Sequence, residues 1–287
     1  MSKHHTNEWL FTISSKRKLI DLNLKEVWRY RDLLMLFVKR DVVTVYKQTI
    51  LGPLWYLIEP LFTSIIFTLI FNNVANISTG TVPPFLFNLA SITIWNYFKV
   101  CFMSTSNTFS ANAGIFGKVY FPRIIVPISV VISNLLKFGI QLFVFGCFYI
   151  YYYHQGAQIS LNRYTFLFPL IIIIMGMLGL GLGMIISSLI TKYRDLRVLI
   201  SFGLQLLMYV SAVMYPVSFF KEKLPNYAWV VAYNPLTFVV ESVRYMLLST
   251  GTFNINMFIY TLSVTLVIFF TGIIIFNKTE KNFIDTV

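Results

Sequence analysis

The sequence predicts an all-α integral membrane protein with six transmembrane helices. Of its 287 residues, 57% are hydrophobic and only 12% are charged, whereas a soluble domain is about half apolar and about a quarter charged. Six segments are apolar enough and long enough to cross a bilayer core, which takes roughly 20 helical residues. They cover residues 54–74, 85–106, 124–153, 164–190, 198–215 and 257–276.

The spans divide the chain into three parts. Residues 1–52 form an N-terminal arm, 53–276 the transmembrane domain, and 277–287 a short tail. The basic run Lys16-Arg17-Lys18 is not followed by an apolar stretch of sufficient length before Lys39. The arm therefore does not read as a signal peptide.

The end of the arm predicts an amphipathic interface helix. In residues 32–47 the apolar side chains are interrupted by charges at 32, 39–41 and 47. Such a helix is too short and too charged to span, so we expect it to lie in the membrane interface with its apolar side in lipid. A soluble helix folded under the membrane domain remains the alternative.

A seventh apolar segment, residues 228–248, differs from the six spans. It contains Asn234-Pro235, which interrupts a helix, and the charges Glu241 and Arg244. A charge at the bilayer centre costs about 2.5–3.5 kcal/mol on insertion scales. We predict a re-entrant helix pair within residues 219–249, between spans five and six; a true seventh span remains open.

The distribution of Lys and Arg orients the spans. Ten lie in the N-terminal arm, two in the loop 112–123, three in the loop after span four and two in the tail, against four on the opposite side. The positive-inside rule then places both termini in the cytoplasm. The net charge of +12 thus lies along a membrane surface and does not indicate nucleic-acid binding.

Catalytic and metal-binding patterns are missing from the sequence. His4, His5 and His154 lack the spacing of metal ligands, and Cys101 and Cys147 each lie inside an apolar run. Residues 117–118 read Gly-Lys but lack the other positions of a nucleotide-binding P-loop. If ATP powers this protein, another polypeptide binds the ATP and its Mg²⁺.

Small residues recur in the fourth span. Gly176, Gly179, Gly181 and Gly183 lie within an apolar helix with no preceding strand, so they do not form a dinucleotide-binding loop. Residues 179 and 183 are four apart and share a helix face. We expect these glycines to permit close helix–helix packing.

A few side chains inside the spans are candidates for a translocation path. Ionisable residues within spans are functional candidates by default; here they are Glu59, Lys99 and Lys137. The two lysines are expected to face a polar cavity or to pair across helices. The aromatic residues Trp95, Tyr97, Tyr209 and Tyr215 either anchor the spans at the interface or line a conduit and stack on sugar rings.

Five motifs resemble those of the permeases of type-2 ATP-binding-cassette (ABC) transporters and follow one another in the same order. The resemblance is strongest to the polysaccharide and O-antigen export subunits, and the teichoic-acid export permeases are the next most similar. The similarity covers residues 30–280. The motifs are TVYKQTILGPLWYLIEPL (44–61), GIFGKVYFPRIIVP (114–127), KYRDLR (192–197), YPVSFFKEKLP (215–225) and NPLTFVVESVR (234–244).

The resemblance implies a homodimer with a pore between subunits and two copies of a separate ATPase. It implies that residues 112–123 hold a coupling helix seated in the ATPase, that 32–47 also touch the ATPase, and that 219–249 form an outer gate. Phe121-Pro122 would stop the coupling helix, Tyr120 and Phe121 would anchor in the partner, and Glu241 would pair with Arg244. The candidate coupling residues are Gly117, Lys118, Val119, Tyr120, Phe121, Pro122, Arg123, Lys39, Arg40 and Asp41. The candidate path residues are Glu59, Trp95, Tyr97, Lys99, Tyr209 and Tyr215, and those of the gate are Asn234, Pro235, Glu241 and Arg244.

The resulting hypothesis is a permease subunit of an ABC exporter, in the inner membrane of a bacterium, that moves a lipid-linked polysaccharide outward. The chain itself would be neither an enzyme nor a cofactor carrier. A teichoic-acid or small-molecule exporter of the same family is the alternative. An integral-membrane enzyme acting on lipid-linked glycans is a further alternative, although the loops offer few polar groups for its chemistry.

Overall fold

The computed structural model describes residues 24–47, 52–119, 121–193 and 195–283, and all regular secondary structure in these ranges is helical. The elements are α1 (Leu24–Arg29), α2 (Arg31–Lys47), η1 (Gly52–Leu54), α3 (Trp55–Phe67), η2 (Thr68–Val74), α4 (Pro84–Ser106), α5 (Thr108–Phe116), α6 (Ile125–His154), η3 (Arg163–Leu167), α7 (Phe168–Lys192), α8 (Leu196–Val210), α9 (Val217–Lys223), η4 (Pro225–Tyr227), α10 (Ala228–Ala232), α11 (Pro235–Leu248) and α12 (Ile255–Phe283).

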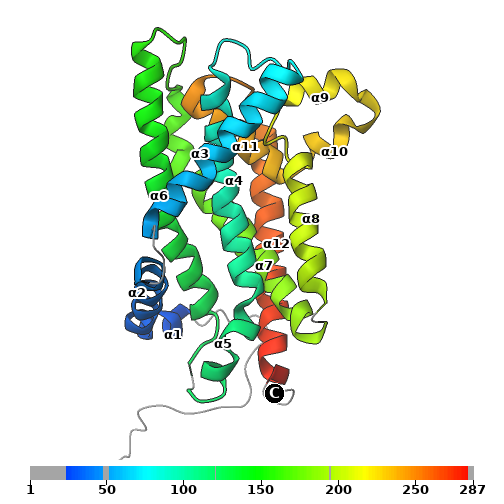
Figure 1. Cartoon of the computed structure of the whole chain (residues 1–287). Coiled ribbons are helices and arrows are strands. Elements are labelled where there is room, and N and C mark those ends of the chain that lie inside the picture. The colour runs from blue at the N-terminus through cyan, green and yellow to red at the C-terminus, as the bar shows by residue number, and fades with distance from the viewer. Residues whose placement is uncertain (1–23, 48–51, 120, 194, 284–287) are drawn as a thin grey trace, which may run out of the picture.

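The long helices run side by side along one axis, with α5 at one end of the bundle and α9 and α10 at the other (Figure 1). We call these the inner end and the outer end. Five helical stretches in the described residues have the length and composition to cross a membrane: Trp55–Val74, Pro84–Ser106, Ile125–His154, Arg163–Lys192 and Ile255–Glu280. They correspond to five of the six predicted spans.

The remaining predicted span, residues 198–215, is shorter than expected. Its helix α8 has 15 residues and ends at Val210, so it is about 22 Å long at 1.5 Å per residue. Ser211 to Met214 leave the helix and are buried, and Ala212 adopts a left-handed φ of 52°. Hydropathy predicted helix through Tyr215 because this buried turn is as apolar as the helix before it.

In the seventh apolar segment the helix is interrupted at Asn234-Pro235, as predicted. α10 ends at Ala232 and α11 begins at Pro235, leaving helices of five and 14 residues. Both are shorter than a bilayer core requires. The Asn234 side chain accepts a hydrogen bond from Leu236 N at 3.0 Å and so caps α11.

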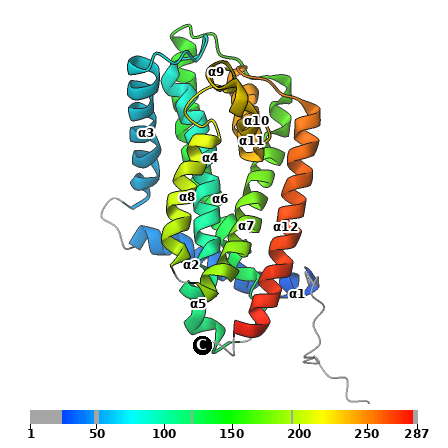
Figure 2. The same ribbon diagram turned by 90° about the vertical axis from the view of Figure 1, so that its right-hand side faces the viewer.

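The predicted interface helix is α2, and it begins within one residue of the expected position. Figure 2 shows α2 running crosswise to the long helices near the inner end. Phe37 and Val38 are buried against the bundle, whereas Met35 and Leu36 are about 60% exposed. Part of the apolar side thus packs on the protein itself, and the rest is exposed.

The core lies where α4 packs between α6, α7 and α11. The glycines of α7 permit this packing, as predicted: Gly179 and Gly183 face α4, where a Cβ on Gly183 would lie 2.6 Å from Thr105 Cβ. Gly181 faces α12 instead. A Cβ on Gly272 of that helix would lie only 2.5 Å from the Gly181 carbonyl oxygen, so α7 and α12 meet backbone to backbone.

Candidate coupling, path and gate sites

The inner end carries a short protruding helix, α5, where the coupling helix was expected (Figures 1 and 2). It ends at Phe116, with Gly117 as its C-cap. The following Lys118 and Val119 are exposed, Val119 by 57%. The helix therefore stops earlier than the predicted position at Phe121-Pro122, and the turn 117–119 forms the exposed tip.

The last residues of the predicted coupling loop pack inward. Phe121 is 4% exposed, and its ring lies 5.7 Å from that of Phe37 and 5.8 Å from that of Phe116 between centroids. This position does not fit the expectation that Phe121 anchors in a partner, because its ring already fills a cluster between α2 and α5. Pro122 is buried beside it. Tyr120, the other expected anchor, lies outside the described residues.

Arg123 also points into the protein. Arg123 is only 6% exposed. Its guanidinium donates to the Glu280 carbonyl oxygen at 2.9 Å, and the guanidinium carbon lies 5.2 Å from the Phe116 ring centroid. It links the start of α6 to the end of α12 and does not project from the surface. On α2, Arg40 pairs with Asp41 at 2.8 Å, and Lys39 is exposed.

The expected path residues separate into exposed and buried groups. Glu59 of α3 and Lys99 of α4 form an ion pair at 3.2 Å, with side chains 59% and 44% exposed. The lysine thus pairs across helices, one of the two arrangements expected of it. Trp95 and Tyr97 are instead 2% and 4% exposed within the core, so neither faces the surface of the subunit.

The two remaining path residues lie near the outer end of α8. Tyr209 is 44% exposed. The Tyr215 hydroxyl donates to the Tyr209 carbonyl oxygen at 2.6 Å, and its ring stacks on Phe220 of α9 with 5.8 Å between centroids. These tyrosines therefore form part of the contact between α8 and α9.

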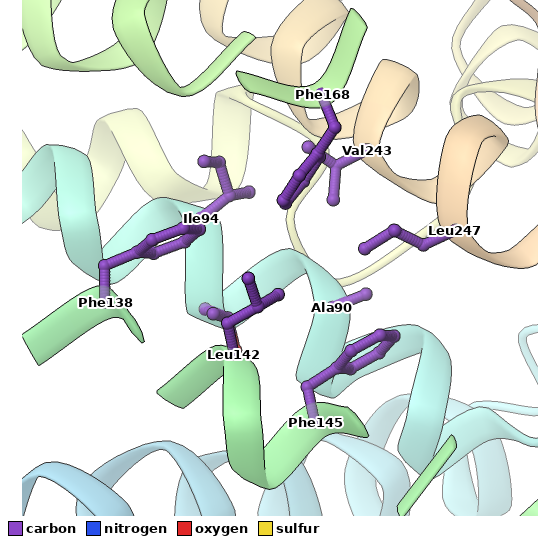
Figure 3. Close-up of a pocket in the computed structure, with 9 residues that line it drawn as sticks. Ala90, Ile94, Phe138, Leu142, Phe145, Phe168, Val243 and Leu247 are labelled. Atoms are coloured by element: carbon purple, nitrogen blue, oxygen red, sulfur yellow. The ribbon is translucent and has the colours of Figure 1, made fainter. Parts of the chain in front are cut away.

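A small pocket, with room for about one water molecule, opens between α4, α6, α7 and α11. Figure 3 shows the rings of Phe138, Phe145 and Phe168 converging on it. Its one hydroxyl, on Thr93, already donates to the Leu89 carbonyl oxygen at 2.8 Å. Thr93 is the one residue with a polar side chain among those that line the pocket.

The predicted pair of Glu241 and Arg244 is confirmed, at 3.4 Å, and it belongs to a larger buried network. Arg244 is 1% exposed. Its guanidinium donates to Ser91 Oγ of α4 at 2.7 Å, to the Val213 carbonyl oxygen at 2.7 Å and to the Tyr215 carbonyl oxygen at 3.2 Å. The guanidinium carbon also lies 3.8 Å from the Phe87 ring centroid. Burial raises the pKa of the Glu241 carboxyl, and Arg244 opposes that rise.

The same face of α11 holds the end of α8 at two further points. Asn234 Nδ2 donates to Ser211 Oγ at 3.1 Å, and the Thr237 hydroxyl donates to the Val210 carbonyl oxygen at 3.4 Å. The three α11 side chains thus satisfy backbone and hydroxyl groups that the end of α8 leaves unpaired. These hydrogen bonds explain how α8 can end at Val210 inside an apolar environment.

Sequence reasoning missed several members of these sites. Ser91 reads as an ordinary small residue of a span, and the carbonyls of 210–215 carry no sequence signal. An arginine inside an apolar helix does indicate that hydrogen-bond acceptors for its guanidinium lie nearby. At the inner end, Arg197 of α8 donates to Ser110 Oγ of α5 at 3.1 Å, a link between separate motifs that spacing does not reveal.

The described residues contain no group of three or more His, Cys, Asp or Glu side chains able to hold a metal ion. Cys101 is buried and Cys147 is exposed, both as free thiols.

Comparison with known proteins defines the class: residues 32–248 match the ABC-2 type transporter family, and the chain belongs to it. It is similar to the O-antigen export system permease protein RfbA of Klebsiella pneumoniae, with 29% identity over 254 residues, covering 88% of this chain and 94% of the relative. It is also similar to the protein of the same name in Myxococcus xanthus, with 24% identity over 267 residues, 92% of this chain and 98% of the relative.

Proposed function

We propose that this chain is the permease subunit of an ATP-driven exporter that moves a lipid-linked polysaccharide, such as an O-antigen, across the cytoplasmic membrane. The functional names of the relatives support the substrate class. In this proposal two copies of the chain form the pore, and two copies of a separate ATPase bind below them. The inner end and both termini face the cytoplasm of a bacterium, and the chain stays in the inner membrane.

The observation that carries the proposal is the attachment of α8 at both of its ends. Its inner end is bonded to α5 through Arg197 and Ser110, and its outer end to α11 through the Arg244 network. Between these ends only Leu204 of α8 is buried. A push on α5 can therefore move α8 as a unit and reach the outer helices without dismantling the core.

In this proposal each group of candidate residues has a role. Gly117, Lys118 and Val119 form the tip that meets the ATPase, assisted by Lys39 and Arg40 of α2. Glu59, Lys99 and Tyr209 are exposed polar groups on spans and line the path, where a tyrosine face suits the C–H face of a sugar ring. The α8 helix serves as the short fifth of six spans, and α9 to α11 re-enter the outer leaflet as the gate.

Deletion of the gene with complementation tests the function. Cells without the chain should lose the surface polysaccharide and accumulate its lipid-linked form inside, and the wild-type chain should restore export. Affinity purification from the same cells should recover an ATPase and two copies of the chain. Unchanged surface glycan after deletion, or a chain that purifies as a monomer without an ATPase, would refute the proposal.

A further inference from the structure

The span formed by α3 and η2 is attached to the bundle at few places. Within α3 only Pro60 and Ser64 are buried, and no residue of η2 is buried. Near the outer end, Asn88 of α4 donates to Thr68 Oγ1 at 3.1 Å and to Asn72 Oδ1 at 2.9 Å. The span therefore relies on polar contacts, and not on a broad packed face, to hold its position.

The inner half of α3 is held by two lysines from neighbouring helices. Lys99 of α4 pairs with Glu59 at 3.2 Å. Lys137 of α6 places its ammonium 5.1 Å from the Tyr56 ring centroid, and Gln141 donates to the Tyr56 carbonyl oxygen at 3.1 Å. Removing α3 from this position would leave both ammonium groups in need of another partner.

Both lysines lie in the inner halves of their helices. Lys99 is 15 residues from the outer start of α4 and Lys137 is 17 residues from the outer end of α6, which at 1.5 Å per residue is about 22 Å and about 26 Å. A hydrocarbon core is about 30 Å thick. The ammonium groups thus come within reach of the phosphates of the leaflet at the inner end.

The charge at this place is unbalanced. Lys99 pairs with Glu59, whereas Lys137 forms no ion pair among the described residues. Asp41 of α2 acts on Lys137 electrostatically but is itself paired with Arg40 at 2.8 Å, so three cations here meet two carboxylates. The Lys99 and Glu59 side chains are both substantially exposed, so Lys99 can exchange its partner without opening the core. A phosphate or diphosphate offers several acceptor oxygens and a charge at least equal to that of the carboxylate it would replace.

We propose that Lys99 is the receptor for the phosphate linkage of a lipid-anchored glycan in the inner-end leaflet, and that the phosphate displaces Glu59. Once displaced, Glu59 is repelled by the bound phosphate, and the inner end of α3 loses its ion pair to α4. Substrate binding thus loosens the most weakly packed span beside the path. The inference rests on the proposed function and gives its path a substrate-sensing residue.

Binding to the full chain in lipid nanodiscs tests the receptor. The probe is a fluorescent polyprenyl diphosphate, with the matching polyprenol as the phosphate-free control and phosphatidylglycerol as the ordinary membrane phosphate. Lys99→Gln should weaken diphosphate binding about tenfold or more, as expected for a lost charged hydrogen bond. Glu59→Gln should instead tighten binding, because it removes the competing carboxylate. Lys192→Gln, which changes a lysine at the inner end of α7, should leave binding unchanged.

The opposite response of the two variants separates a receptor from a structural ion pair. If the pair only holds the fold, Lys99→Gln and Glu59→Gln should weaken binding together, and that result would overturn the inference. Equal competition by phosphatidylglycerol would also overturn it, since Lys99 would then be a general lipid contact. Either failure leaves the proposed function standing, because the deletion experiment tests export without reference to Lys99.

Discussion

The contact between Gly181 of α7 and Gly272 of α12 yields a quantitative prediction. A Cβ added at Gly272 would lie 2.5 Å from the Gly181 carbonyl oxygen and 3.1 Å from Gly181 Cα. Favourable C–H···O contacts between helices have C···O distances of about 3.3–3.6 Å. Both neighbouring atoms belong to backbone, so no side chain can turn away, and the two helices must separate by about 0.8 Å to reach the shorter of these contacts.

The cost of that separation can be estimated. Overpacking a tight interior by one methyl group costs typically about 1–3 kcal/mol, and replacing glycine by alanine inside a helix returns up to about 1 kcal/mol. Both clashing atoms belong to backbone, so the upper part of this overpacking range applies, about 2–3 kcal/mol, and Gly272→Ala should lower the free energy of unfolding by about 1–2 kcal/mol. Gly146 of α6 provides the matched control, because a Cβ there would meet no atom within 4 Å. Gly146→Ala should be neutral or slightly stabilising.

Thermal unfolding in detergent, followed as the loss of the folded peak in size-exclusion chromatography, measures the difference. At about 2–4 °C per kcal/mol, Gly272→Ala should lower the apparent midpoint by about 2–8 °C relative to the wild type. Because heating a membrane protein is often irreversible, both variants are scanned at one rate. An unchanged or raised midpoint for Gly272→Ala, alongside a similar result for Gly146→Ala, would refute the backbone contact between α7 and α12.

Three further predictions concern the gate and the coupling tip. Arg244→Met leaves the Glu241 carboxylate and two carbonyl oxygens without their donor, so the free energy of unfolding should fall by about 3–5 kcal/mol. Lys223→Met, which changes an exposed lysine of α9, should leave it unchanged, and equal stability of the two variants would contradict the network. Asn234→Ala removes the cap of α11, and the same assay should show a loss of about 1 kcal/mol, with a midpoint at the wild-type value counting against the cap. Lys118→Glu should reduce surface polysaccharide in cells while the purified chain keeps its midpoint, whereas Lys192→Glu should export normally; normal export by Lys118→Glu would show that the tip has no coupling role.

Hydropathy alone determined most of the membrane architecture. Five spans lie where runs of apolar residues predicted them, because a backbone in lipid must satisfy its hydrogen bonds internally and long apolar runs leave only the helix. Local chemistry also identified the break at Asn234-Pro235 and the pairing of Glu241 with Arg244, since a proline cannot continue a helix and residues three apart share a face. These features depend only on neighbours in the chain.

The tertiary structure decided which face of each helix is covered. A span in lipid is apolar on all sides, so no amphipathic pattern marks the side that packs, and the sequence did not reveal that Trp95 and Phe121 are buried. Nor did it reveal that α8 stops at Val210, because the donors that satisfy its end come from Asn234, Thr237 and Arg244 on another helix. Apolar length determines where the chain enters and leaves the membrane, whereas contacts between distant segments determine where a helix can end and which polar groups remain exposed.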